Sequence, residues 1–189
     1  MAHIIERVGP YRISYHEPDF SALARSIVYQ QLSGKAAATI FGRVLEAAAG
    51  PNRKLSPEAL LALGPEGLRP LGLSKQKSAY VLDLSEKIRS GQLSFDRLPQ
   101  MTDAEVIAAL TAVKGVGVWT AHMFLIFALK RPDVLPTGDL GIRNAMQRAY
   151  KLEAPPKPAE MEELGRAYRP FASVASWYLW RSLDGDAAL

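Results

Sequence analysis

The segment that decides the fold runs from Val113 to Asp139 and reads VKGVGVWTAHMFLIFALKRPDVLPTGD. A Lys-Gly-Val-Gly turn separates two stretches of helical periodicity, and the carboxylate of Asp139 closes the segment. Gly115 and Gly117 are predicted to take backbone angles closed to other residues and to let another molecule approach the main chain. The next helix is predicted to begin at about Val118. Its free N–H groups would make an anion site suited to one phosphate of a nucleic-acid backbone.

Composition allows a protein that binds nucleic acid. The chain has 189 residues, 48% of them hydrophobic, so one large domain or two small lobes with a real core are expected. Lys and Arg number 23 against 19 Asp and Glu, and the net charge of +4 permits nucleic-acid binding without requiring it. Cysteine is absent, which excludes disulfides, thiol catalysis and Cys-ligated metal clusters.

The chain shows no signal for export or membrane insertion. The N-terminus lacks the apolar run of a signal peptide, and the most apolar stretch, 123–129, is too short to span a bilayer. We therefore expect a cytoplasmic (nucleoid) or nuclear protein that is not secreted and has no membrane partner.

Apolar residues recur at spacings of three and four along most of the chain, which predicts an all-α bundle of about eight to ten short helices with little or no strand. The predicted helices follow Pro18, Gly34, Ser56, Ser74 and Thr102, then cover 118–129, 139–150, 159–169 and 171–183. The helix over 118–129 is apolar nearly all round, so it is expected to be buried. Residues 3–15 are compatible with either a small strand or an irregular arm.

The hairpin residues resemble a known signature. Lys-Gly-Val-Gly-Val-Trp-Thr-Ala, 114–121, together with Asp139, is similar to the helix-hairpin-helix–Gly/Pro–Asp (HhH-GPD) superfamily of DNA base-excision glycosylases. That pattern is Leu-Pro-Gly-Val-Gly, two variable residues and Thr-Ala; here Val113 replaces the usual Leu and Lys114 the usual Pro. Helix–Gly–helix corners are also ordinary structural connections, so the glycines alone favour a structural role. The combination with Asp139 favours the glycosylase.

Three further segments resemble the 3-methyladenine DNA glycosylase II (alkylpurine glycosylase) family. They are QQLSGKAAATI at 30–40, LGLSKQKSAYVLDLSE at 71–86 and RPFASVASWYLW at 169–180. The resemblance implies a two-lobed helical bundle forming a single glycosylase domain over 1–189. Its expected parts are an N-terminal arm (1–19), mainly the first lobe (20–110), the hairpin and catalytic Asp (111–150) and C-terminal helices (151–189).

Asp139 is the predicted catalytic residue. It follows Pro-Thr-Gly and precedes an apolar helix, so it is also an N-cap candidate, and a cap alone is the commoner role. The two roles are compatible, because a cap holds the carboxylate rigidly beside the positive helix end. Cleavage of an N-glycosidic bond builds positive charge on the sugar, which a fixed anion stabilises.

The resemblance also implies a monofunctional enzyme. Members that cut the strand carry a Lys two residues after the second glycine, and its amine attacks the sugar. This chain has Trp119 there, so water is the expected nucleophile. The expected substrates are 3-methyladenine, 7-methylguanine and related alkylated purines in double-stranded DNA, bound by a monomer. The alternatives are a non-catalytic helix-hairpin-helix DNA-binding or lesion-sensing protein and, less favoured, a glycosylase for oxidised purines.

Excision requires that the base leave the stack. By resemblance, Leu32 would wedge into the gap, although its spacing of four from Val28 also fits core packing. The candidate DNA-binding residues are Leu32, Ser33, Lys114, Gly115, Val116, Gly117 and Thr120. The candidate base-pocket residues are Trp119, Phe171, Tyr29 and Met123.

Other polar residues carry weaker expectations. Lys35, Lys75 and Lys77, near predicted helix starts, are candidate phosphate contacts, with solvated surface lysine as the alternative. His122 is expected to be a packing or polar-face residue. The three histidines lack metal-ligand spacing, so neither a metal nor a cofactor is expected. A monovalent cation on backbone carbonyls of the hairpin would suit the family.

Overall fold

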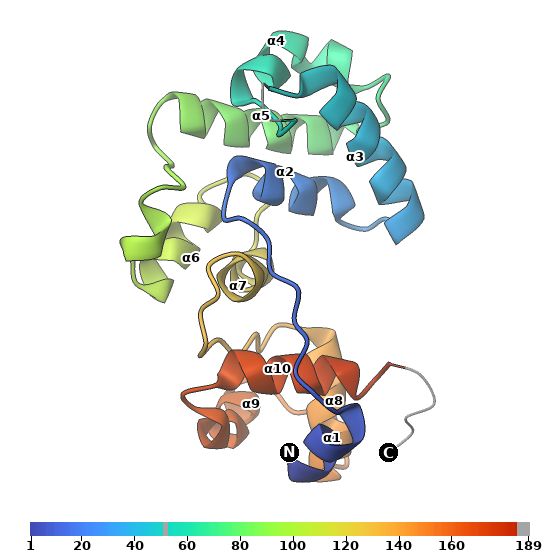
Figure 1. Cartoon of the computed structure of the whole chain (residues 1–189), viewed down its shortest axis with the longest axis vertical. Coiled ribbons are helices and arrows are strands. Elements are labelled where there is room, and N and C mark those ends of the chain that lie inside the picture. The colour runs from blue at the N-terminus through green and yellow to red at the C-terminus, as the bar shows by residue number, and fades with distance from the viewer. Residues whose placement is uncertain (51–52, 185–189) are drawn as a thin grey trace. The chain divides into compact units, whose positions relative to one another are not determined.

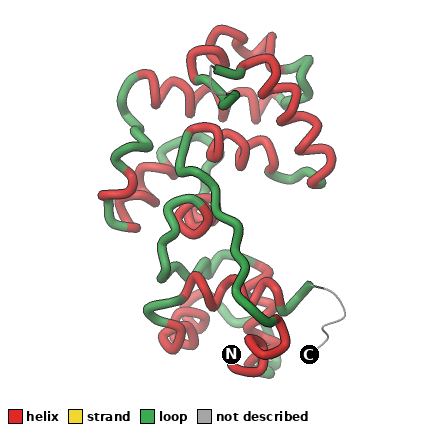
Figure 2. Tube along the Cα trace, in the orientation of Figure 1, coloured by secondary structure: helices red, strands yellow, loops and turns green. Residues whose placement is uncertain are grey.

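The computed structural model describes residues 1–50 and 53–184, and these are helical with no strand pairing beyond one isolated bridge between Ala49 and Leu55 (Figures 1 and 2). The helices are α1 (Ala2–Val8), α2 (Phe20–Tyr29), α3 (Gly34–Ala48), α4 (Pro57–Leu68), α5 (Lys75–Arg89), α6 (Asp103–Thr111), α7 (Val118–Phe127), α8 (Leu140–Tyr150), α9 (Pro158–Gly165) and α10 (Ala172–Arg181). Two short 3₁₀ turns, η1 (Leu98–Gln100) and η2 (Arg166–Tyr168), complete them. The all-α fold class is confirmed.

The chain forms two compact units. Unit 2 is continuous and holds residues 16–124, whereas unit 1 joins residues 1–15 to residues 125–189. The boundary falls within α7, so the unit 2 part of that helix follows the glycine hairpin directly. No helix of the described residues is long and apolar enough to cross a bilayer.

Helix starts in unit 2 are set by polar caps. The side chains of Asp19, Ser33, Ser56 and Ser74 each accept a hydrogen bond from a backbone N–H in the first turn of α2, α3, α4 and α5. Thr102 and Glu105 form a reciprocal capping box at α6. The predicted starts of these helices are therefore confirmed.

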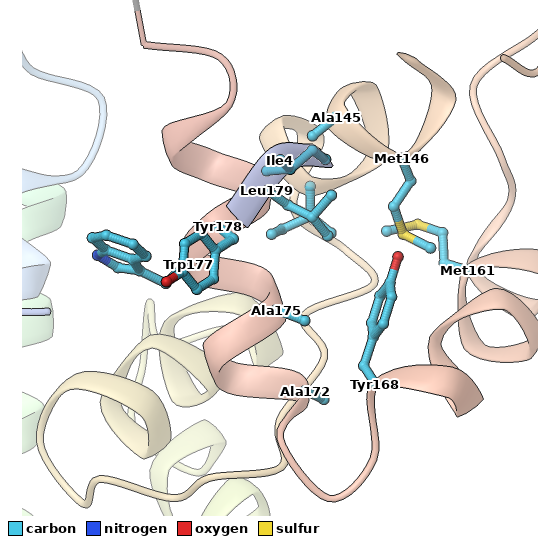
Figure 3. Close-up of a cluster of buried hydrophobic side chains, with 11 residues drawn as sticks. Ile4, Ala145, Met146, Met161, Tyr168, Ala172, Ala175, Trp177, Tyr178 and Leu179 are labelled. Atoms are coloured by element: carbon cyan, nitrogen blue, oxygen red, sulfur yellow. The ribbon is translucent and has the colours of Figure 1, made fainter. Parts of the chain in front are cut away.

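Unit 1 is organised around α10. Its buried core brings together side chains from α1, α8, α9, η2 and α10 (Figure 3). The labelled members are Ile4, Ala145, Met146, Met161, Tyr168, Ala172, Ala175, Trp177, Tyr178 and Leu179. Figure 3 shows Ile4 of α1 beside Leu179 of α10, so the N-terminal helix is part of this core.

The prediction for residues 3–15 was wrong over its first half. Residues 2–8 form α1 instead of a strand or an irregular arm, and Ile4 is 3% exposed. The hydroxyl of Tyr178 donates a 3.0 Å hydrogen bond to the carbonyl of Gly9, which holds the end of the helix. A helix this short depends on tertiary packing rather than on its own propensity, so its sequence carries little signal.

The prediction that the helix after the hairpin is buried is wrong for the first two residues of α7. Val118 is 52% exposed and Trp119 is 47% exposed, whereas Ala121 and Leu125 are fully buried. The first turn therefore presents large apolar side chains to solvent. Exposing large apolar side chains to water is unfavourable, and such exposure is typical of a binding surface.

Candidate functional site

The glycine hairpin joins α6 to α7 in unit 2. Gly115 has a φ of 78°, a conformation that side chains other than glycine rarely adopt, and the N–H of Val116 donates to the carbonyl of Val113 at 3.1 Å. A Cβ atom at Gly115 would lie 2.1 Å from the ring of Tyr80. Both the positive φ and this close approach therefore require glycine. Gly117 lacks a positive φ, and a Cβ there would meet nothing within 4 Å. The expectation of unusual backbone angles was right for Gly115 and wrong for Gly117.

Helix α5 supports this hairpin. The carboxylate of Asp83 accepts a 2.9 Å hydrogen bond from the backbone N–H of Lys114 and lies 3.5 Å from its ammonium group. Lys87 lies 3.7 Å from the same carboxylate. The side chain of Lys114 is nevertheless 72% exposed, so it can still contact a phosphate.

A pocket of 560 Å³ opens beside the hairpin, entirely within unit 2. Its lining contains six of the predicted residues, namely Tyr29, Gly115, Gly117, Trp119, Thr120 and Met123. Ser26, Gln30 and Gln31 line it as well and were not predicted. The structure thus brings three of the four predicted base-pocket side chains together, next to both glycines.

The two aromatic rings of the pocket differ in exposure, since Trp119 is 47% exposed and Tyr29 is half-buried. The guanidinium of Arg25 lies 4.0 Å from the centroid of the Tyr29 ring, and Phe41 packs edge-on against the same ring. A cation already on the ring makes Tyr29 a poor second platform for a cationic base. Trp119, with nearly half of its surface exposed, is the better one.

The connection between α2 and α3 carries the predicted wedge. Leu32 is 39% exposed, so the core-packing alternative is wrong; α2 ends at Tyr29 and the spacing from Val28 no longer applies. Gln31 has a φ of 56°, the left-handed conformation, and Ser33 caps α3. The side-chain amide of Gln30 donates a 2.9 Å hydrogen bond to the carbonyl of Gly115. This amide ties the connection to the hairpin.

The other predicted DNA-binding residues differ in exposure. Val116 is 5% exposed and Thr120 is 6% exposed, so their side chains are largely internal. Lys35 and Lys75 lie on exposed positions at helix starts. Lys77 is different: its ammonium group donates to the carbonyls of Val28 and Gln30, both at 2.6 Å. Lys77 therefore faces the protein interior instead of a phosphate, and burial lowers its pKa.

Asp139 lies in unit 1 as the N-cap of α8. Its Oδ1 atom accepts hydrogen bonds from the N–H of Ile142 at 2.8 Å and from Nε1 of Trp180 at 2.9 Å. Asp139 is 8% exposed. The predicted cap is confirmed, and Trp180 is a partner that the sequence did not indicate.

Phe171 also belongs to unit 1. It occupies the N-cap position of α10 and is 60% exposed, so its ring is available to a ligand. His122, on α7 in unit 2, is half-buried, and this burial lowers its pKa despite the opposing charge of Asp103. Among the described residues, no group of three or more His, Asp or Glu side chains is arranged to hold a metal ion.

Comparison with known proteins identifies relatives along nearly the whole chain. DNA-3-methyladenine glycosylase 1 of Schizosaccharomyces pombe is 32% identical over 184 residues, which cover 95% of this chain and 80% of that protein. A Bacillus subtilis protein named putative DNA-3-methyladenine glycosylase is 32% identical over 169 residues. These cover 87% of this chain but only 59% of the Bacillus subtilis protein.

Solved structures give the same result. The Schizosaccharomyces pombe 3-methyladenine DNA glycosylase in complex with abasic DNA has a TM-score of 0.81 at 32% identity, covering 96% of this chain and 89% of that one. A DNA-3-methyladenine glycosidase from Bacillus halodurans has a TM-score of 0.88 at 37% identity, covering 98% and 85%. Residues 24–170 match the family described as HhH-GPD superfamily base excision DNA repair protein. The chain belongs to the HhH-GPD superfamily of base excision DNA repair proteins.

Proposed function

We propose that the protein is a monofunctional DNA glycosylase that removes alkylated purines, such as 3-methyladenine and 7-methylguanine, from duplex DNA by base flipping. The observation that carries the proposal is the exposed Trp119 ring in a pocket that Gly115 and Gly117 also line. The names of the relatives support the substrate class. The enzyme is proposed to act as a monomer.

The chemistry of the pocket suits such bases. N3- and N7-alkylated purine nucleotides carry a positive charge, and an electron-rich aromatic face attracts a cation more than a neutral base. Trp119 is the proposed platform in this pocket, and Phe171, which is exposed in unit 1, is proposed as a further base contact. The hairpin backbone and Lys114 are proposed to bind phosphates, in keeping with the helix-terminus and lysine contacts typical of DNA backbones.

Asp139 is the proposed catalytic residue. The N-glycosidic bond breaks with its electron pair leaving on the purine, so a cationic alkylpurine departs as a neutral base. A water oxygen then bonds to the sugar C1′ and loses one proton. The carboxylate stabilises the positive charge that develops on the sugar and accepts that proton. A strong general acid is unnecessary, because the leaving base already carries the charge.

The absence of strand cleavage is part of the proposal. The position two residues after Gly117 holds Trp119, which has no amine to form a Schiff base with the sugar. Incubation with lesion-containing duplex and borohydride should therefore give no covalent protein–DNA adduct. A trapped adduct would show that another amine attacks the sugar.

A monovalent cation on hairpin carbonyls is also proposed. The carbonyls of Val113 and Gly115 each already accept one hydrogen bond, from Val116 and Gln30, which leaves each oxygen one further lone pair. Duplex affinity should be higher in potassium than in tetramethylammonium at equal ionic strength. Equal affinity would remove the cation from the proposal.

The decisive experiment is base release from methylated duplex by wild type and Asp139→Asn, followed by mass spectrometry. Asn retains the oxygen that caps α8, so the fold should survive, whereas the rate should fall on the order of 10³-fold with little change in duplex binding. Glu163→Gln, which neutralises an exposed carboxylate paired with Arg166, is the matched control and should retain the wild-type rate. Wild-type binding without release would favour the lesion-sensing alternative instead.

A further inference from the structure

One face of α5 contacts both DNA-binding elements of unit 2. Lys77, Tyr80 and Asp83 follow one another at intervals of three residues, so they lie along one side of the helix. Lys77 contacts the end of α2, the Tyr80 ring lies under Gly115, and Asp83 accepts from Lys114. We call residues 30–33, which carry Leu32, the wedge connection. Helix α5 therefore supports the wedge connection at one end and the hairpin further along.

Lys77 makes the most specific of these contacts. It donates to the carbonyl of Val28 in the last turn of α2 and to the carbonyl of Gln30, the C-cap residue, at 2.6 Å each. Carbonyls at a helix C-terminus have no partner within the helix and carry partial negative charge, so a lysine is well matched to them. The lysine is half-buried. Its charge is thus used within the protein, on the backbone that immediately precedes the wedge.

The other hydrogen bonds of the wedge connection among the described residues are longer. Gln31 is in the left-handed conformation, and the N–H of Leu32 reaches the carbonyl of Tyr29 only at 3.4 Å. The side-chain amide of Gln30 donates to Gly115 at 2.9 Å, and the N–H of Ala37 donates to the carbonyl of Ser33 at 2.9 Å. The N–H of Gln30 reaches the carbonyl of Ile27 at 3.4 Å, and the Ser33 cap accepts from Ala36 at 3.4 Å. Among the described residues, Lys77 therefore supplies the shortest hydrogen bond to this connection, at the carbonyl of Gln30.

We propose that Lys77 is a positioning residue for base extrusion, which holds the Gln30–Ser33 connection rigid so that Leu32 can enter the base stack. This inference rests on the proposed function. Unstacking a base costs a few kcal/mol. Leu32 can displace a base only if the wedge connection that carries it does not move instead. The contacts of Lys77 with the carbonyls of Val28 and Gln30 are called the clamp. Because the Gln30 amide donates to Gly115, the clamp also fixes the wedge connection relative to the hairpin, which is proposed to bind the DNA backbone.

The test compares Lys77→Met with Lys77→Arg and with Arg89→Met. Arg89 lies near the end of the same helix in an exposed pair with Glu86, so Arg89→Met makes the same change in charge without touching the wedge. Lys77→Met should lower the single-turnover release rate from a paired lesion on the order of tenfold or more. Lys77→Arg should recover part of the rate, and Arg89→Met should match wild type.

A second substrate separates positioning from a general structural defect. In an unpaired bulge the lesion is already partly extruded, so Lys77→Met should slow release from the bulge much less than release from paired duplex. Leu32→Ala should abolish the difference that Lys77→Met makes, because both changes disable the same wedge. An equal slowing on both substrates, or additive effects of the two changes, would overturn the proposal.

Hydrogen exchange tests the clamp without relying on activity. Amides of residues 30–33 should exchange faster in Lys77→Met, with exchange in α10 unchanged. If wild type releases no base, the proposed function fails while the exchange result still decides whether Lys77 restrains the connection. Should Lys77→Met fail to fold, Lys77→Gln is read in its place, because its neutral amide nitrogen lies one bond nearer the backbone and removes the charged contact with both carbonyls. Unchanged exchange at 30–33 in a folded variant would refute the clamp.

Discussion

Nε1 of Trp180 donates a 2.9 Å hydrogen bond to Oδ1 of Asp139, a residue 41 positions earlier in the chain. The same oxygen accepts the N–H of Ile142 at 2.8 Å. Gly141 keeps this arrangement open, because a Cβ there would lie 3.0 Å from Oδ1 of Asp139 and 3.2 Å from Cδ1 of Trp180. Two donors from different helices therefore fix the orientation of the proposed catalytic carboxylate.

Trp180→Phe should slow base release about tenfold while leaving duplex affinity near that of wild type. A hydrogen bond to a charged group contributes ~1.5–3 kcal/mol, and ~1.4 kcal/mol corresponds to a factor of ten. Single-turnover kinetics and duplex titration separate the two quantities. Trp177→Phe is the matched control: Trp177 also lies on α10 but packs against Tyr11 and Tyr178, so its loss should affect stability and not the rate of folded enzyme.

Gly115→Ala should lower stability much more than Gly117→Ala. Ala at Gly115 would need a left-handed backbone and would displace the Tyr80 ring, so the free energy of unfolding should fall by about 2 kcal/mol or more. Ala at Gly117 meets no protein atom within 4 Å, so stability should change by less than about 1 kcal/mol. Urea unfolding measures both. Duplex affinity should fall in both variants, and unchanged affinity in Gly117→Ala would show that the backbone there does not approach DNA.

Leu32→Ala should reduce release from paired duplex with almost no loss of stability, because Leu32 is already 39% exposed. Leu23→Ala is the contrasting change, since Leu23 is fully buried and its truncation should cost about 2–5 kcal/mol. Thermal unfolding and release kinetics on both variants check the pair. A large loss of stability in Leu32→Ala would return that side chain to a packing role.

His122 should make stability depend on pH below its unfolded pKa. Burial lowers the pKa of His122 in the folded state, so the unfolded chain binds the proton first as pH falls, and the folded state loses stability below about pH 6.5. Wild type should therefore lose more stability between pH 7.5 and pH 5.5 than His122→Gln. Urea midpoints at the two pH values provide the measurement, and equal losses would show that the folded pKa is not lowered. The nearby Asp103 carboxylate opposes the effect and limits its size.

Local signals predicted most of the fold. The caps at Ser56, Ser74 and Thr102 act within one turn of the chain, so their positions determine where α4, α5 and α6 begin. Asp139 was recognisable as a cap for the same reason. The α1 helix was missed because its stability depends on the burial of Ile4 in unit 1.

The hydrogen-bond partners of the site residues carried no such signal. Trp180 reaches Asp139 across 41 residues, and the Gln30 amide reaches Gly115 across 85. Lys77 looked like a surface lysine at a helix start, and only its two carbonyl contacts show that it faces inward. The three-residue spacing of Lys77, Tyr80 and Asp83 was visible in the sequence, but it did not indicate which residues these side chains contact.

By itself, the amino-acid sequence determined the described helices other than α1, the glycine hairpin and the cap at Asp139, because each depends on residues within a few positions of one another. It also determined the family, through several such short segments. Tertiary structure alone decided that Gly115 must lack a side chain against Tyr80, that Trp180 donates to Asp139 and that Lys77 donates to the end of α2. Those contacts join residues that are distant in the chain, because they depend on the directions that side chains take when helices pack together.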